Sequence, residues 1–190
     1  MRIIVIVFSG FVALACAAAS STGDSAGARA GGERGEGGPV AASVITAAPA
    51  TFEVALGGDV VRRLELHLAH GSLEVARLIL RDLRPRAAQT LKGVRIFVEK
   101  PEAYAGTPVA DPHYAGNFVL GLEDSQTMLW NIAPTLSRLW HSGALTAKGL
   151  AQRKALRITF VPDPAESAAS LPKDFALTFK SLTIELPRQP

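Results

Sequence analysis

The sequence predicts an all-β domain, an antiparallel β-sandwich of jelly-roll or immunoglobulin-like type that contains one short helix. Short runs rich in β-branched and aromatic residues recur, and turn residues separate them. A segment rich in glycine and alanine divides these runs from the apolar start of the chain, so we expect one domain of residues 43–187. Only one segment combines helical spacing with signals at both of its ends.

Period-two alternation of apolar residues identifies most of the expected strands. "TFEVAL" ends at a Gly-Gly pair, and in "DVVRRLELHLAHG" Leu64, Leu66 and Leu68 share one strand face, so these segments are expected to form a hairpin. Similar alternation occurs in "GVRIFVEKP", "GNFVLGLE", "KALRITFVPDP" and "DFALTFKSLTIELP". The segment "SLEVARLILRDL" fits both a helix and a strand, and its periodicity leaves the two open.

The segment "APTLSRLWHSG" is the expected helix. Pro134 suits the first helical position, because the N–H that proline lacks would have no helical partner there. Leu136, Leu139 and Trp140 fall on one helix face, and Gly143 can end the helix.

The first 16 residues have the layout of a secretory signal peptide. Arg2 precedes an apolar run that is too short to cross a bilayer of about 30 Å as a helix. Cys16, the only cysteine, follows the residues "VALA", which resemble a bacterial lipobox. Lipidation would explain a lone thiol in an exported protein and would anchor the chain in the cell envelope, at the outer membrane or in the periplasm. Ordinary signal-peptidase cleavage, which would leave a secreted protein, stays open as the alternative.

Residues 17–42 are predicted to form a flexible tether between Cys16 and the domain. They contain no aromatic residue and only one large aliphatic side chain, a valine. Such a segment buries too little apolar surface to offset the entropy lost on ordering. A tether directly after a lipidated cysteine would hold the domain away from a membrane surface.

The charge distribution predicts no nucleic-acid partner. The 190 residues carry a formal net charge of +3, and basic and acidic residues are interleaved. The densest basic run consists of Arg77, Arg81, Arg84 and Arg86. An acidic residue lies within this run and no aromatic residue does, which favours a mixed, solvated face over a nucleic-acid site.

A succession of short motifs resembles one protein family. The motifs are, in order, "GVRIFVEKPEA", "TPVADPHYAGNFVLG", "MLWNIAPTLSRLWHSGAL", "LRITFVPDP" and "LTIEL". They resemble the C-terminal β-sandwich domain of tyrosinases and polyphenol oxidases, which is distantly related to the sandwich domain of arthropod haemocyanins. The resemblance covers residues 75–186 and extends more weakly to residue 51. Ala133 departs from it, because the family often has a helix-capping threonine at that place.

The resemblance implies a domain that packs over a helical copper domain and, in latent forms, shields the active site. Paired copper needs three histidines around each ion, whereas this chain has four histidines in all. In a strand, His67 and His70 would point to opposite faces and could not bind one ion together. The serines lack a G-x-S-x-G setting, and no glycine-rich loop leads from a strand into a helix. We therefore expect no metal, no cofactor and no enzymatic activity.

The stretch "TPVADPHYAGNF" is the most distinctive of the motifs. The carboxylate of Asp111 can accept a backbone N–H two residues on, Pro112 has a fixed φ, and Gly116 tolerates conformations that other residues resist. These three residues predict a structural turn that carries His113 and Tyr114 into a strand.

The expected function is that of a non-catalytic, exported and lipid-anchored sandwich protein that binds or shields another protein, such as a separately encoded tyrosinase-like copper protein. The candidate partner-binding residues are Tyr104, His113, Tyr114, Arg138 and His141. The alternative is a ligand-binding or adhesive module of the cell envelope, for example one that binds carbohydrate. An exposed aromatic row, with Trp130 and Trp140 as the residues to examine, would favour the alternative, and an apolar patch with a polar rim would favour protein binding.

Overall fold

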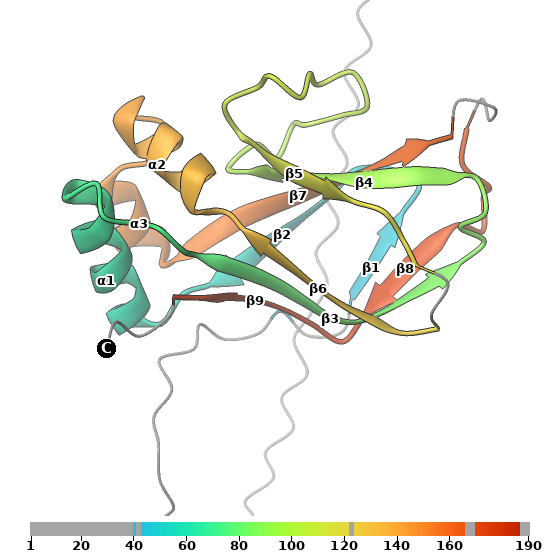
Figure 1. Cartoon of the computed structure of the whole chain (residues 1–190), viewed down its shortest axis with the longest axis horizontal. Helices are drawn as coiled ribbons and strands as arrows, with labels where there is room; N and C mark the ends of the chain where they lie inside the picture. Colours follow the sequence, from blue (N-terminus) through green and yellow to red (C-terminus); the bar gives the residue numbers. More distant parts are fainter. Residues whose placement is uncertain (1–39, 41–42, 122–123, 166–169, 187–190) are drawn as a thin grey trace, which may run out of the picture. The chain divides into compact units, whose positions relative to one another are not determined.

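Two antiparallel sheets form the framework of the computed structural model, which describes residues 40, 43–121, 124–165 and 170–186 (Figure 1). The first sheet, called sheet one, has the order β1 (Ser43–Thr46), β8 (Ala176–Phe179), β3 (Arg77–Arg86) and β6 (Gln126–Asn131), with β9 (Ser181–Glu185) also paired to β3. Sheet two has the order β2 (Ala50–Ala55), β7 (Ala155–Pro164), β4 (Leu91–Val98) and β5 (Tyr114–Phe118).

Aromatic contacts close the sandwich along both of its sides. At one side the ring of Phe118 in β5 lies 5.0 Å from that of Trp130 in β6. At the other side the ring of Phe52 in β2 lies 5.3 Å from that of Phe179 in β8. Between them, the inward side chains of both sheets form one buried apolar cluster. The predicted all-β sandwich is therefore confirmed.

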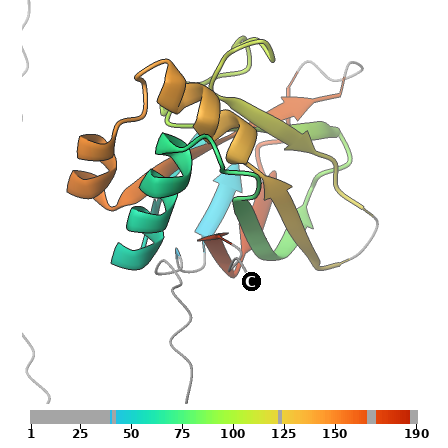
Figure 2. The same ribbon diagram turned by 60° about the vertical axis from the view of Figure 1, so that its left-hand side comes forward.

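Three helices gather at one end of the strands, where Figure 1 and Figure 2 show them side by side. They are α1 (Gly58–Ala69), α2 (Ala133–His141) and α3 (Ala147–Arg153). The helix predicted in "APTLSRLWHSG" is α2, with Leu136 and Leu139 buried and Trp140 packed against the core. The expectation of one helix was too low, because the described part of the chain contains three.

The predicted second strand of the first hairpin is wrong, because these residues form α1. Its buried residues, Val60, Val61, Leu64 and Leu68, have helical spacing, whereas Leu66 is exposed. The leucines at every second position therefore fitted a strand by coincidence. The Gly-Gly pair marks the start of the helix, with Gly57 in the N-cap position, instead of a hairpin turn.

Helix α3 was not predicted. Thr146 is its N-cap, and its Oγ1 accepts a hydrogen bond from the N–H of Gly149 at 3.1 Å. Only Leu150 of this helix is buried, so the segment has too little apolar periodicity to be recognised from the sequence.

The ambiguous segment "SLEVARLILRDL" contributes the first part of β3, the central strand of sheet one. The first half of β3 pairs with β6 and β9, and the second half of β3 pairs with β8. A bulge separates the halves at Asp82, whose φ of 54° is in the left-handed region. Because β3 pairs with neighbouring strands on both of its sides, this part of the ambiguous segment is a strand and not a helix.

The N-terminal predictions lie outside the described residues. The signal peptide of residues 1–16 with Cys16, and all of the tether of residues 17–42 except Val40, belong to the part that the structure does not describe. Val40 forms an isolated antiparallel bridge with Leu182. None of the helices described is both long and apolar enough to cross a membrane.

Candidate functional site

A loop of residues 99–113, called the covering loop, connects β4 to β5 and lies over the outer face of sheet two (Figure 1). Beneath it is a second, smaller apolar cluster of Phe97, Ala103 and Val161, and Tyr114 packs against this cluster. The rings of Phe97 and Tyr114 are 5.6 Å apart and meet edge to face. Val94, Ile96 and Val98 point the other way, as the predicted alternation of β4 requires, and are fully buried in the main core.

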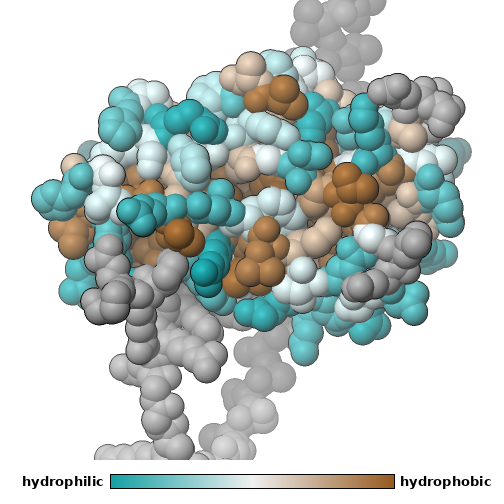
Figure 3. Space-filling view, in the orientation of Figure 1, coloured by the Kyte–Doolittle hydropathy of each residue, from teal (hydrophilic) through white to brown (hydrophobic). Residues whose placement is uncertain are grey.

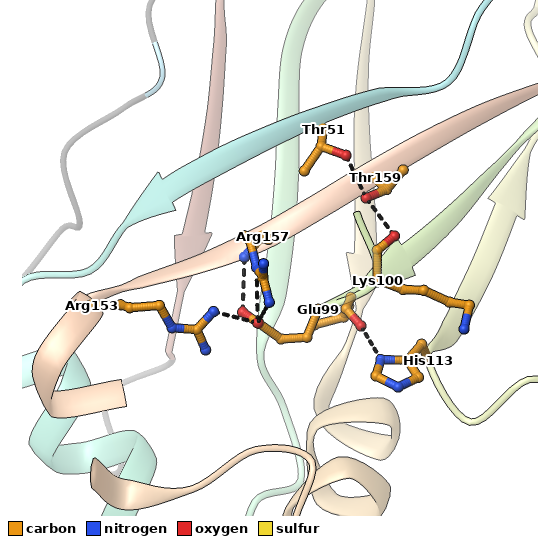
Figure 4. A network of polar contacts seen from close by, with 8 residues as sticks. Thr51, Glu99, Lys100, His113, Arg153, Arg157 and Thr159 are labelled. Carbon is orange, nitrogen blue, oxygen red and sulfur yellow. Dashed lines mark hydrogen bonds and ion pairs between the residues drawn. The ribbon is translucent and has the colours of Figure 1, made fainter. Parts of the chain in front are cut away.

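Glu99 fastens the start of the covering loop to β7 and α3 (Figure 4). Its side chain is only 3% exposed, and its Oε2 lies 2.6 Å from Nη1 of Arg153 and 3.1 Å from Nη2 of Arg157. Its Oε1 accepts the backbone N–H of Arg157 at 3.0 Å. This buried carboxylate therefore has charged or backbone donors on both oxygens.

Lys100 and Asp111 join the two ends of the covering loop. Nζ of Lys100 lies 3.2 Å from Oδ2 of Asp111, whose side chain is 14% exposed. Burial raises the pKa of the Asp111 carboxyl, but the N–H of His113 and the Lys100 ammonium outweigh it, so the pKa lies below its usual value. The hydrogen bond to Asp111 in turn raises the pKa of Lys100.

The residues of the "ADPHYAG" motif form a tight turn that ends the covering loop. Oδ1 of Asp111 accepts the N–H of His113 at 2.9 Å, which is the geometry of an Asx turn. Nδ1 of His113 lies 2.8 Å from the carbonyl oxygen of Val98, and the N–H of Val98 donates to the carbonyl of His113. Gly116 has a φ of 139°, which favours glycine.

Arg95 holds the middle of the covering loop, a role that the sequence analysis missed. Its Nη1 donates to the carbonyl of Thr107 at 2.7 Å, and its Nη2 donates to the carbonyl of Ala105 at 2.6 Å. Arg95 faces outward on β4, and its side chain is 11% exposed because the loop covers it. The alternation predicts that Arg95 faces outward. It does not predict the partners of Arg95, which lie on a loop 10 to 12 residues further along the chain.

Arg138 links α2 to the same turn. Its Nη2 donates to the carbonyl of Tyr114 at 2.8 Å and lies 2.9 Å from Oγ1 of Thr135. Thr135 itself donates to the carbonyl of Tyr114 at 3.1 Å. The guanidinium of Arg138 is thus directed at backbone oxygens of this chain.

A surface hollow of about 450 Å³ lies between the covering loop and α2. Val109, Asp111, Pro112, Tyr114 and Arg138 are among the residues that line it. Val109 and Tyr104, another residue of the loop, are each 62% exposed. The structure therefore brings four of the sequence-predicted residues together, and it adds Val109, which the sequence analysis did not name as a site residue.

Three predicted partner-binding residues, Tyr104, His113 and His141, do not line this hollow. The ring of His113 is used in the turn described above. Tyr104 packs its ring over Gly106, where an added Cβ would meet Cε2 of the ring. His141 is exposed near the end of α2, and its Nδ1 lies 2.6 Å from the carbonyl oxygen of Ser137. His141 therefore interacts within its own helix.

The arguments about His67 and His70 need correction, because both belong to the end of α1 and not to a strand. His67 is in the last turn, His70 is the C-cap residue, and residues three apart are neighbours on a helix surface. Nδ1 of His67 lies 3.0 Å from Oγ of Ser72. Among the described residues, no group of three or more histidine, cysteine, aspartate or glutamate side chains could hold a metal ion.

Fold and site together define a β-sandwich in which the covering loop lies over sheet two and is held there by hydrogen bonds and ion pairs. No family model and no curated protein matches the chain. A recombinantly expressed latent aurone synthase (polyphenol oxidase) is similar to it, with a TM-score of 0.46 and 16% identity over 77% of this chain and 25% of the enzyme. The latent aurone synthase from natural source gives a TM-score of 0.44 and 15% identity over 80% and 26%. This chain spans about a quarter of the length of these enzymes. Both of these enzymes are polyphenol oxidases.

Proposed function

We propose that this chain is a non-catalytic, exported β-sandwich protein that docks onto another protein through the covering loop and α2. The observation that carries the proposal is a loop held rigidly in place while two apolar side chains, Tyr104 and Val109, remain largely exposed on it. A rigid loop loses little conformational entropy when a partner binds. Exposed apolar side chains on such a loop are the groups that a partner would bury.

The polar contacts of the covering loop also indicate that it is held in one position. Glu99, Arg95 and the Lys100–Asp111 pair each fix a different part of it. These side chains use their polar atoms within this chain, so they serve to present the loop. The partner would then contact the hollow lined by Arg138 and Val109, and also Tyr104 elsewhere on the covering loop.

A tyrosinase-like copper protein is the partner that we propose, because the sequence motifs resemble a domain that covers a copper site. This chain would supply the cover, and the partner would supply the copper site. Shielding of the partner's active site is a consequence that the proposal allows and does not require.

The carbohydrate-binding alternative receives less support at this site. Trp130 packs on Phe118 and Trp140 packs against the core, so neither offers a free ring. Among the large apolar side chains that the structure shows to be exposed, Tyr104 is the one aromatic. A row of rings for stacking sugars is therefore absent from the described surface.

Crosslinking in native membranes, followed by mass spectrometry, tests the docking site. The double substitution Tyr104→Ser with Val109→Ser should abolish crosslinks to the partner. The matched control is Leu66→Ser on α1, since Leu66 is exposed to a similar degree, 57%, on a different element. Crosslinks only to glycans or to copies of this chain, or equal loss in the control, would overturn the proposal.

We also propose that lipid on Cys16 anchors the chain to a membrane of the cell envelope. The support is the sequence alone: a short apolar run, a sole cysteine and a segment of tether composition. Intact-mass measurement of the native protein should give a mature chain that begins at a lipid-modified Cys16. An unmodified chain beginning beyond Cys16 would contradict the anchor and leave the docking site untouched.

A further inference from the structure

Four arginines of β3 lie exposed on the outer face of sheet one, and a lysine follows β8 next to them. We call these residues the basic strip: Arg77, Arg81, Arg84, Arg86 and Lys180. The helices pack on one another and against β5 and β7, at the end of the sandwich. Figure 3 shows apolar areas only as separate spots among hydrophilic side chains on the visible face of the molecule.

The bulge at Asp82 is what brings the arginines to one face. In a regular strand, positions 77 and 81 would point to one side and positions 84 and 86 to the other. The bulge inserts one extra residue between Leu80 and Leu83, so the alternation is reversed after it. Leu78, Leu80 and Leu83 are accordingly all fully buried, and the four arginines all face outward.

The strip has more positive than negative charge. Nη2 of Arg81 lies 3.3 Å from Oε1 of Glu185, and Nε of Arg84 lies 3.0 Å from Oδ1 of Asp82. The Ser125 hydroxyl and the Arg84 guanidinium hold the pKa of the Asp82 carboxyl below its usual value. The arginines at the two ends of β3 have no side-chain partner among the residues that the structure describes.

The strip also accounts for the net charge of the sequence. Of 20 basic and 17 acidic residues, the strip and its two acidic partners comprise five and two. The rest of the sequence then holds 15 of each sign, so the formal net charge of +3 equals the excess at the strip. A concentrated excess of this kind attracts anions.

The neighbours of the strip can donate and accept hydrogen bonds. The strand register places the hydroxyl groups of Thr178 and Ser181 beside β3, opposite Arg84 and Arg81. The exposed apolar side chains of this sheet, Val44 and Leu129, lie on its outermost strands, β1 and β6. An arrangement with cations and hydroxyls in the middle suits a polar chain better than a lipid surface, into which apolar groups would insert.

We propose that the basic strip binds a linear anionic polysaccharide. Acidic groups of the polymer pair with the guanidinium groups of Arg77 and Arg86, and its hydroxyls bond to the side chains of Thr178 and Ser181. The strip follows one strand for roughly 30 Å, so an extended polymer can contact it at several points. This site is on the sheet opposite to the covering loop and does not depend on the protein-docking function.

Binding of a linear polyuronate to the full chain, measured by calorimetry, tests the proposal. Arg77→Ser with Arg86→Ser should weaken binding about tenfold or more, because the substitutions remove both of the cations that are proposed to pair with the acidic groups of the polymer. The matched control, Arg62→Ser with Lys148→Ser, removes the same charge from exposed helix positions and should change the affinity little. Raising the salt concentration should weaken binding by the unsubstituted chain.

Three outcomes would overturn the proposal. Equal loss in both double variants would mean that net charge alone is responsible. Equal binding of a neutral polymer such as dextran, or no binding of polyuronate, would exclude an anion site. In a parallel measurement with phosphatidylglycerol vesicles, a difference between the two double variants that appears there and not with polyuronate would assign the strip to a membrane instead. Any lipid on Cys16 is common to all variants, so it does not affect this comparison.

Discussion

The outer faces of the two sheets use similar side chains in different ways. On sheet two, the covering loop lies over Arg95, and the carboxylate of Glu99, the first residue of this loop, is almost fully buried between Arg153 and Arg157. On sheet one, Arg81 and Glu185 form an ion pair of the same chemistry in which both side chains stay partly exposed. The first arrangement holds the fold together, whereas the second leaves cations available to a ligand.

The difference follows from the solvent around each pair. A buried carboxylate has lost its water, so removing its partners or its charge leaves uncompensated groups in a poorly solvated place. An exposed pair exchanges its partner for water at little cost. Substitutions at matched positions of the two faces should therefore differ in their effect on the free energy of unfolding.

The largest effect is expected for Glu99→Gln. This substitution keeps the shape of the side chain but leaves two guanidinium groups without their shared carboxylate. The free energy of unfolding should fall by about 3 kcal/mol, at the lower end for buried pairs because the arginines are partly exposed. Urea unfolding, followed by tryptophan fluorescence, measures the change. Glu185→Gln on sheet one is the control and should cost less than about 1 kcal/mol; equal costs would remove the distinction between the two faces.

A smaller effect is expected for Arg95→Met. The methionine fills part of the space under the covering loop but leaves the carbonyls of Thr107 and Ala105 without their charged donor. The free energy of unfolding should fall by about 2 kcal/mol, and amide hydrogens of the loop should exchange faster. Hydrogen exchange, measured by mass spectrometry on individual peptides, reports both the change in the free energy of unfolding and the exchange of the loop amides. Arg84→Met on the strip should leave loop exchange unchanged, and faster exchange there as well would show that the loop is not held by Arg95.

The smallest effect concerns pH and the Lys100–Asp111 pair. The lowered pKa of Asp111 means that its contribution is present above the usual value of 3.8 and is lost as the pH falls through the folded-state pKa. The raised pKa of Lys100 means that its contribution is present below 10.5 and is lost as the pH rises through the folded-state pKa. Between these limits Asp111→Asn, which keeps an acceptor for the turn, should lower stability by about 1 kcal/mol.

Unfolding measured at several pH values checks this prediction. The difference between the unsubstituted chain and Asp111→Asn should shrink at both ends of the pH range. Asp82→Asn on the strip should show the same sign at acid pH, because the pKa of Asp82 is also lowered, and a smaller size, because that pair is exposed. A difference that does not vary with pH would show that the Asp111 charge is not involved.

Local sequence was sufficient for the elements whose residues carry their own signals. The alternation in β4, the proline at the start of α2, and the sequence Asp-Pro-His-Tyr-x-Gly all describe short-range geometry, and the structure has a strand, a helix and an Asx turn at these places. Fold class could be predicted because several such strands recur in one domain of suitable length.

Only the tertiary structure decided the features that depend on distant partners. Leu64 and Leu68 fit a strand and a helix equally well, and packing in the core selected the helix. The partners of Glu99 lie more than 50 residues away along the chain. The common face of the β3 arginines depends on one bulge, which the pairing of β3 with its neighbours creates. By itself the sequence determined which segments could form strands or helices. Which side chains contact one another, and on which face of a sheet they lie, depended on the free energy of contacts between strands far apart in the chain.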